Sequence, residues 1–279
     1  GYVRDGLINW WDGIDNAGVG KHDSYATVWK DKAGTIDLRL TSRGTWNATG
    51  NGLTVNGCSA TGTVATAAYK TVEATFKIKD STARILFASG CSAGANSNNQ
   101  PPRFVLFDHN KDGDGTMRGY FDGAKTTIYA TMQRDPAHLY TLTGVYNDNN
   151  TVTHVYSDGV EDLSGKTFGN SWGIGDGKAM IGSRDKNSAY PWYGDVFAIR
   201  LYDRALTSAE IANNRALDLY RFSGDGSAPA DSFAARITLV QVTGEGDDVS
   251  AWTDEVPGTA KTLVQSAATG EVAWYPKAG

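Results

Sequence analysis

Several features that mark common functional classes are missing from this 279-residue chain. No apolar run approaches the ~18 residues of a membrane-spanning helix, so we expect no membrane insertion. Lysine and arginine form no cluster and the formal net charge is -5, whereas nucleic acids and anionic membranes require a basic face. We therefore expect no nucleic-acid partner. The first residues also lack the charged, apolar and small-residue order of a signal peptide, so we interpret the chain as a mature or excised region.

Cysteine is scarce as well. Cys58 and Cys91 are the only two cysteines, so the chain permits at most one internal disulfide bond. That bond would require an oxidising compartment, which the sequence does not establish. A bridge and two buried free thiols therefore both stay open.

The sequence shows no recognisable pair of catalytic carboxylates. Glycoside hydrolysis needs an acid and a nucleophile or base at a defined separation, and no Glu-x-Asp-x-x-Glu strand occurs. The histidines lack the short spacing of zinc ligands; they are His22, His109, His138 and His154. These absences argue against an enzyme.

The residues that are abundant favour many short strands joined by turns. The 33 glycines occur with many Thr, Asn, Asp and Ser, which supply positive φ or local side-chain hydrogen bonds. Residues 72–79 alternate strictly, which predicts a half-buried antiparallel strand with Glu73 alone among the acidic residues of its polar face. Other β-rich runs are 84–88, 103–107, 117–121, 126–131, 139–146, 151–156, 179–182 and 196–202.

One helix is predicted after these strands. Thr207 can cap its start while Glu210 reaches back in a Thr-x-x-Glu capping box. After Phe222 comes a stretch of small residues and proline that is typical of a linker. We therefore divide the chain into a β domain at 1–222, a linker at 223–230, and a β-prone extension or truncated neighbouring domain at 231–279.

Several segments match one family pattern in the expected order. Residues 193–211, YGDVFAIRLYDRALTSAEI, are similar to a terminal strand followed by R-I-Y-N-R-A-L-[ST]-x-x-E-I. Residues 139–159 end in Tyr156-Ser157-Asp158-Gly159, similar to a hairpin with Y-x-[DN]-G, and 179–182 supply an I-G strand. Together with 6–16 and 29–31, these segments resemble the laminin-G-like family of concanavalin A-type jelly rolls, which is common in bacterial surface proteins.

The resemblance implies a fold and a setting. The expected fold is all-β, a two-sheet antiparallel β-sandwich of the jelly-roll type over residues 3–222, with the short C-terminal helix sealing one edge or end and a small β-prone appendage. We expect a secreted or cell-surface bacterial protein, with this chain as part of a larger multidomain molecule. The expected function is a non-catalytic module that binds a glycan or polysaccharide, or mediates adhesion. A structural or protein-binding spacer without a sugar site is the alternative, and a glycoside hydrolase is less favoured.

A glycan site is predicted where aromatic and polar residues converge. The apolar face of a pyranose stacks on an aromatic ring while its hydroxyls bond polar groups, and a pocket needs both. The residues that combine them at short range are Trp172, Arg184, Asp185, Asn187, Tyr190 and Trp192. Trp192 also matches a family position that is often filled by a packing aromatic, so a core role is the alternative for it.

Calcium is the predicted cofactor, with two rival sites. Residues 108–114 carry the first half of a calcium-loop pattern in Asp108, Asn110, Asp112 and Asp114, but Gly119 stands where the loop would need its bidentate Glu. The family resemblance points instead to Asp12, Asp15 and Asp195. Turn-forming aspartates that bond their own backbone are the alternative interpretation of these residues.

Overall fold

The chain separates into two compact units, Gly1–Arg236 and Ile237–Gly279. The computed structural model describes residues 1–64, 69–79, 86–91, 104–107, 116–122, 127–133, 135–148, 152–162, 177–183, 191–223, 252–253, 262–265 and 272–274. The second unit contains one antiparallel sheet of β17 (Trp252–Thr253), β18 (Thr262–Gln265) and β19 (Val272–Trp274). Residues 224–230 of the predicted linker lie outside the described residues, so its bounds stay a prediction.

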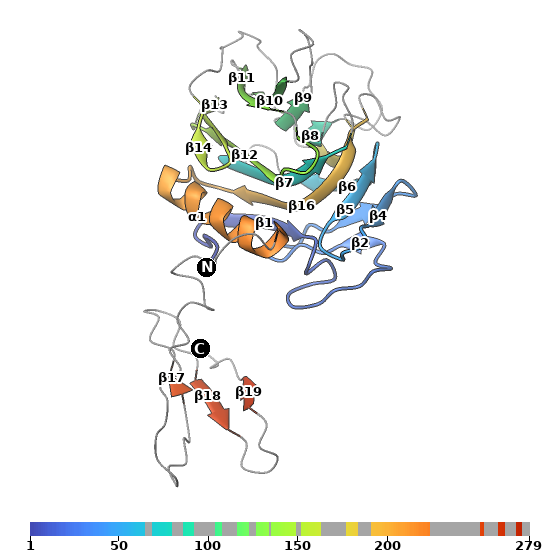
Figure 1. Cartoon of the computed structure of the whole chain (residues 1–279), viewed down its shortest axis with the longest axis vertical. Coiled ribbons are helices and arrows are strands. Elements are labelled where there is room, and N and C mark those ends of the chain that lie inside the picture. The colour runs from blue at the N-terminus through green and yellow to red at the C-terminus, as the bar shows by residue number, and fades with distance from the viewer. Residues whose placement is uncertain are drawn as a thin grey trace. The chain divides into compact units, whose positions relative to one another are not determined.

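The larger unit is a sandwich whose main layer is an eight-stranded antiparallel sheet (Figure 1). Its order is β14-β13-β12-β7-β16-β5-β4, and β1 also pairs with β16. The strands are β1 (Leu7–Asp12), β4 (Gly44–Trp46), β5 (Leu53–Asn56), β7 (Thr71–Ile78), β12 (Tyr140–Tyr146), β13 (Val152–Ser157), β14 (Val160–Glu161) and β16 (Tyr193–Tyr202). Strands β7 and β16 lie at the centre of this sheet. Strands that are far apart in the sequence, such as β1 and β16, are therefore hydrogen-bonded neighbours.

A five-stranded sheet forms the opposing layer, in the order β2-β3-β6-β15-β8. These strands are β2 (Val28–Trp29), β3 (Leu38–Leu40), β6 (Ala60–Val64), β15 (Gly177–Ile181) and β8 (Phe87–Cys91). A third, three-stranded sheet contains β9 (Phe104–Phe107), β10 (Thr116–Asp122) and β11 (Thr127–Gln133). The predicted two-sheet antiparallel jelly roll is therefore confirmed.

Local sequence explains the turns and the core. The turn between β13 and β14 places Asp158 at φ 53° and Gly159 at φ 81°, the left-handed values that a tight hairpin requires. The apolar positions of β7 alternate inward and pack with the second sheet in one core, which includes Val72, Ala74, Phe76, Trp29, Leu38 and Ile181. The alternation therefore correctly predicts which face of β7 is apolar and packs in the core.

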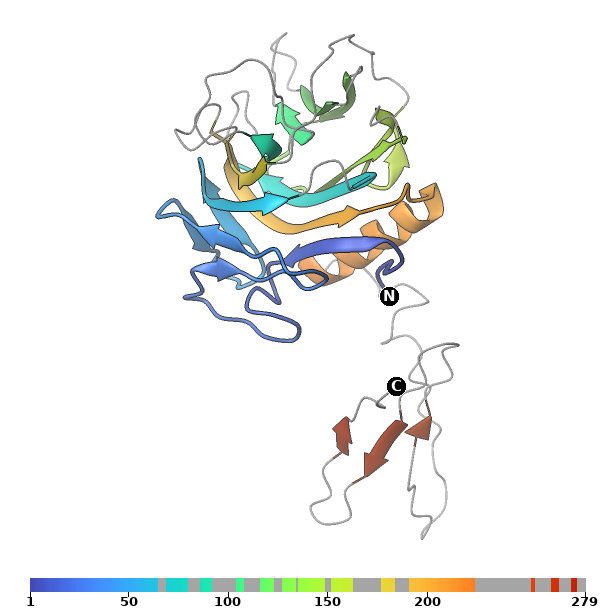
Figure 2. The same cartoon turned by 180° about the vertical axis from the view of Figure 1, so that it is seen from behind.

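The polar face of β7 is buried too, which corrects the prediction of a half-buried strand. Glu73 is 1% exposed and Thr75 is fully buried, because helix α1 (Ser208–Asp218) covers this face. Asn214 of α1 donates to Glu73, and Arg215 donates to Thr141 of β12. In both views α1 lies on the opposite side of β16 from β8 to β11 (Figures 1 and 2).

Helix α1 begins as the sequence predicts. The Thr207 hydroxyl accepts from the Glu210 backbone N–H, and the Glu210 side chain accepts from the Thr207 N–H, which completes the capping box. The helix lies across a face of the sheet instead of sealing an edge or end, because its polar residues pair with the inner strands β7, β12 and β16. A π-helical turn, η2 (Leu219–Ser223), follows it.

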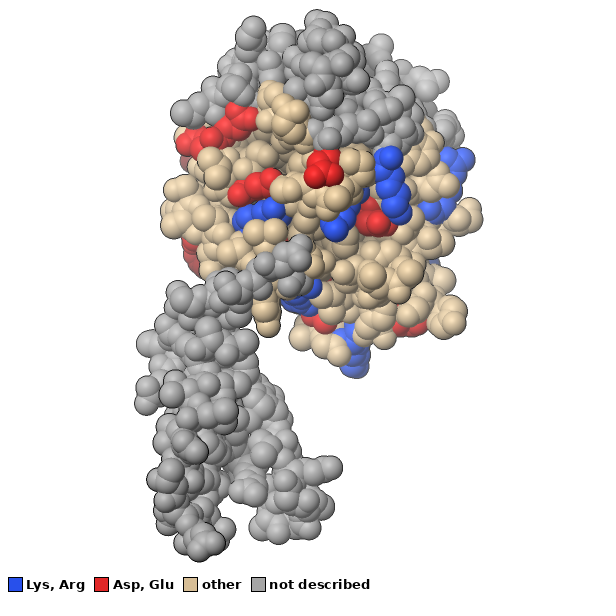
Figure 3. Space-filling view, in the orientation of Figure 1, with Lys and Arg blue, Asp and Glu red and all other residues tan. Residues whose placement is uncertain are grey.

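Charges do not dominate the visible surface. In Figure 3, lysine and arginine are interspersed with aspartate and glutamate among uncharged residues. None of the helices that the structure describes is long and apolar enough to cross a membrane.

Candidate functional site

A hollow of about 430 Å³ lies beside the ends of β2, β3 and β4. Residues 24–27, 40–42 and 44–46 line it. Strands β2 and β3 belong to the five-stranded sheet and β4 to the eight-stranded sheet, so the hollow lies where the two layers meet. Its volume falls within the ~300–1,000 Å³ that small-molecule sites occupy.

Tyr25 is the most exposed large hydrophobic side chain among the described residues, at 91%. Its loop is nevertheless tied down by the fully buried Asn16. The Asn16 side-chain amide donates to the Asp23 carbonyl and accepts from the Asp23 N–H, both at 2.8 Å. The Asp23 carboxylate in turn accepts from the Tyr25 N–H at 2.8 Å. A well-anchored backbone therefore presents an aromatic ring to water.

Trp46 provides a half-buried aromatic wall for the hollow. Its indole Nε1 donates to the Ala26 carbonyl at 2.8 Å, next to Tyr25 in the chain. Its ring packs edge-to-face on Trp29 at a centroid distance of 5.5 Å, and the Trp29 Nε1 donates to the Asp12 carbonyl at 2.9 Å. The wall is thus continuous with the sandwich core.

Hydroxyl groups supply the polar part of the lining. The Thr41 hydroxyl is engaged, since it donates to the Cys58 carbonyl at 2.6 Å and accepts from the Arg43 N–H at 3.1 Å. Among the described residues, the exposed hydroxyls of Thr27, Ser42 and Thr45 bond no other protein group. Each can both donate and accept, so the hollow combines aromatic surface with hydroxyls that are available to a ligand.

The predicted glycan residues are only partly tested by this structure. Trp172, Arg184, Asp185, Asn187 and Tyr190 lie outside the described residues, so their site stays a prediction. Trp192 is described and fully buried, with its ring edge-to-face on Phe76 at 5.9 Å. In this structure its ring is enclosed by the core and presents no face to a sugar.

The predicted calcium ligands near the chain start face protein cations. The Lys32 ammonium contacts Asp15 and lies 3.6 Å from the Asp12 carboxylate. The Arg221 guanidinium lies 3.2 Å from Asp12 and 3.0 Å from Asp15. Burial raises the pKa of Asp12 even though Arg221 and Lys32 lower it.

Asp195 lies apart from that pair. It accepts from the Thr54 hydroxyl at 2.6 Å and from Lys79 at 3.2 Å. In the part of the chain that the structure describes, no three His, Cys, Asp or Glu side chains gather as a metal site. Asp12 and Asp15 thus lie together with Lys32 and Arg221, whereas Asp195 contacts other side chains, and calcium at these residues stays a prediction. The rival ligands Asp108, Asn110, Asp112 and Asp114 lie outside the described residues, so calcium there stays a prediction.

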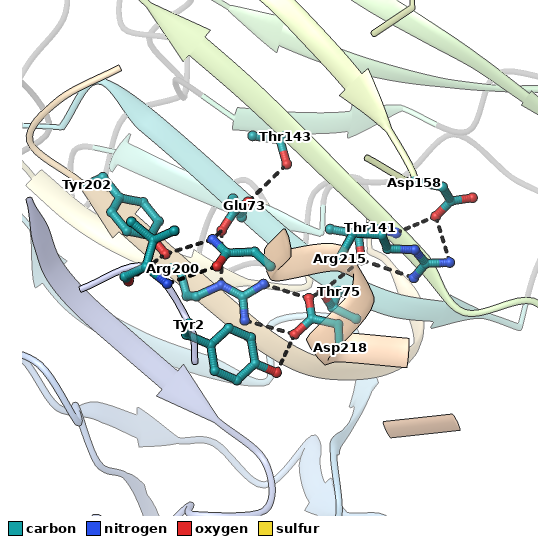
Figure 4. Close-up of polar contacts among 12 residues, drawn as sticks. Tyr2, Glu73, Thr75, Thr141, Thr143, Asp158, Arg200, Tyr202, Arg215 and Asp218 are labelled. Carbon is teal, nitrogen blue, oxygen red and sulfur yellow. Dashed lines mark hydrogen bonds and ion pairs between the residues drawn. The ribbon is translucent and has the colours of Figure 1, made fainter. Parts of the chain in front are cut away.

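Two carboxylates do meet beneath α1 (Figure 4). Arg200 donates from Nε to Glu73 at 3.0 Å and from Nη1 and Nη2 to Asp218 at 2.8 and 2.5 Å. Burial lowers the pKa of Arg200, but Asp218 and Glu73 outweigh it and hold that pKa well above its ordinary value. All three side chains are at most 1% exposed. This network is closed to a substrate, and we interpret it as the polar attachment of α1 to the sheet.

Comparison with known proteins identifies the superfamily to which the fold belongs. A laminin-G family model, described as the concanavalin A-like lectin/glucanase superfamily, matches residues 47–212. Because the matched residues make up more than half of the chain, the chain belongs to that superfamily. No curated protein sequence matches the chain.

Solved structures with a similar fold include sialidases. Trypanosoma rangeli sialidase in complex with sialic acid is 20% identical, with a TM-score of 0.53 over 80% of this chain and 34% of that chain. A mutant of this sialidase that displays trans-sialidase activity has a TM-score of 0.54 at the same identity and coverage. A mutant of HCR/D is 11% identical, with a TM-score of 0.53 over 78% of this chain and 52% of that chain. The chain spans about a third of the length of the sialidases.

These similarities overturn one prediction. The expectation that the chain is not an enzyme is wrong, because the solved structures that share its fold include sialidases. At 20% identity the likeness shows the fold alone, and no activity is carried over. Ser171 also has the Gly-x-Ser-x-Gly spacing of a nucleophile elbow, and it lies outside the described residues.

The sequence analysis missed Tyr25. The available signal was an aromatic residue within the polar run from His22 to Thr27, without the alternation of a strand. Such a residue is expected at the surface, but a single exposed ring is common there and does not by itself indicate a site. The convergence of residues 24–27 with 40–46 depends on strand pairing and could not be derived from the sequence.

Proposed function

We propose that this chain is a carbohydrate-binding domain and that the hollow beside Tyr25 holds the sugar. The single observation that carries the proposal is the combination of a 91% exposed tyrosine ring with unengaged hydroxyls around one hollow. Membership of the lectin/glucanase superfamily supports a carbohydrate-related role. A spacer domain would not require this combination.

The chemistry of the hollow suits a pyranose. The C–H face of a sugar ring is apolar and can cover the Tyr25 ring, which otherwise remains in contact with water. The sugar hydroxyls can exchange water for the hydroxyls of Thr27, Ser42 and Thr45 with little net loss of hydrogen bonding. Because the loop that carries Tyr25 is already tied through Asn16 and Asp23, little backbone ordering is needed on binding.

The proposed setting is a larger secreted or cell-surface bacterial protein that contacts a glycan or polysaccharide. The second compact unit, Ile237–Gly279, and the partial coverage of the matched sialidases are compatible with a multidomain molecule. The segment with Trp172 and Tyr190 remains a second predicted sugar-binding region, which the same experiment tests.

A glycan array with three proteins tests this function. The proteins are the wild type, Tyr25→Ala, and Tyr220→Ala as a control, because Tyr220 is a 42% exposed tyrosine in η2. Taking stacking of bases on aromatic rings as an analogue, we expect Tyr25→Ala to weaken binding by about 1–3 kcal/mol and Tyr220→Ala to leave it unchanged. A silent array with folded wild type would favour the spacer alternative. Equal binding by all three proteins would place the site elsewhere.

A further inference from the structure

The lining of the hollow contains no charged side chain. Its ten residues contribute hydroxyls from Ser, Thr and Tyr, together with Ala, Leu, Gly and Trp. Charged residues flank the lining in sequence without belonging to it, and the exposed Arg43 lies directly between Ser42 and Gly44. Asp23 accepts from the Tyr25 backbone, and Lys30 pairs with Asp37 at 2.6 Å.

This composition has a consequence for charged sugars. A carboxylate or sulfate that packs against this lining gives up part of its hydration, and only a paired cation or several strong donors would compensate for that loss. A neutral hydroxyl loses much less hydration and finds partners in the Thr27, Ser42 and Thr45 hydroxyls. The charge of a sugar therefore affects its binding to this lining more than its stereochemistry does.

We infer that the hollow beside Tyr25 binds uncharged hexose glycans and rejects glycans whose bound unit carries a carboxylate or sulfate. The inference rests on the proposed function and narrows its ligand class. It separates this chain from the matched sialidase complex, whose bound sugar is sialic acid, because sialic acid carries a carboxylate that this lining does not pair.

Titration calorimetry with matched neutral and acidic sugars tests the inference. Neutral oligosaccharides of glucose, galactose and mannose are compared with oligogalacturonate and sialyllactose. We expect at least one neutral oligosaccharide to bind, with a loss of about tenfold or more in Tyr25→Ala, and the acidic sugars to bind at least tenfold more weakly than the best neutral one. Arg43, which lies between two lining residues, is changed to Gln as a further variant. We expect Arg43→Gln to bind the neutral sugar as the wild type does.

A variant that adds a cation gives a second readout. Thr45 is exposed on β4, so Thr45→Arg should strengthen binding of the acidic sugars at least threefold. Thr153→Arg, on an exposed position of β13, is the matched control and should change nothing.

The outcomes separate the inference from the function. Acidic sugars that bind as tightly as neutral ones, with dependence on Tyr25, would overturn the charge selectivity and leave carbohydrate binding intact. Binding that Tyr25→Ala does not change would overturn the inference by removing the hollow as the site. If the folded wild type binds none of these sugars, the proposed function fails and the selectivity fails with it.

Discussion

Trp192 shows how burial decides the role of a single aromatic residue. It is fully buried in the core between the sheets and packs on Phe76. We expect Trp192→Ala to lower the free energy of unfolding by about 3–5 kcal/mol, because the truncation leaves a cavity. Denaturant unfolding measures this change, and the surviving folded protein should keep its glycan affinity. A stable variant with lost affinity would instead identify Trp192 as a sugar platform.

Lys32 and Lys30 offer a matched test of buried and exposed ion pairs. The Lys32 side chain is 3% exposed and pairs with the buried Asp12 and the half-buried Asp15, whereas Lys30 is 49% exposed in its pair with Asp37. We expect Lys32→Met to destabilise by about 2–3 kcal/mol, because the buried Asp12 loses one of its two cations and keeps only Arg221. Lys30→Met should cost no more than about 1 kcal/mol. Similar losses in both variants, measured by chemical denaturation, would contradict this difference.

Side-chain environments are the part that the sequence predicts least well. The alternation around Glu73 correctly separates two faces of β7, but alternation cannot tell whether the second face meets water or another element. Asp12 and Asp15 were predicted as metal ligands, since nothing local indicates that Lys32 and Arg221 would converge on them from distant segments.

At the level of elements, the start of α1 depends on a charged capping residue. The hydrogen bond from Arg204 lowers the pKa of Glu210 from 4.5 to about 2, with burial opposing it and Thr207 adding to it. A carboxylate with a depressed folded pKa stabilises above its unfolded pKa, and that contribution is lost as the pH falls through the folded value. The Glu210 contribution should therefore be complete above about pH 5 and decline toward pH 2.

Comparing the wild type with Glu210→Gln checks this pH dependence. We expect the difference in unfolding free energy between them to be constant from pH 7 to about 5 and to shrink steadily between pH 4.5 and 2. A difference that stays constant down to pH 2, or grows as the pH falls, would show that the Glu210 carboxylate does not make this contribution.

Element positions were predicted more successfully than element packing. The capping box at Thr207 and Glu210 and the turn at Asp158 and Gly159 are local signals, and both occur as expected. The placement of α1 over β7, β12 and β16 follows from Arg200, Asn214 and Arg215 meeting partners across the sheet. Those partners are separated by many residues in the chain, so sequence spacing gave no sign of them.

At the scale of the whole molecule, assigning the fold does not assign the function. Ordered motifs over residues 3–222 identified the lectin/glucanase superfamily, which the family match confirms for 47–212. The same superfamily membership does not choose between binding and catalysis, and the prediction against an enzyme went further than the motifs allowed. The hollow arises from three segments that only the complete sandwich brings together.

Hydroxyl-radical footprinting in the presence and absence of the best array glycan tests the central claim most directly. It reports oxidation of each aromatic side chain in one experiment on the unmodified protein. We predict that saturating glycan protects Tyr25 strongly and leaves Tyr220 unchanged, since only the first lines the hollow. Unchanged oxidation of Tyr25, with protection of Trp172 or Tyr190 instead, would contradict the assignment of the sugar site to this hollow.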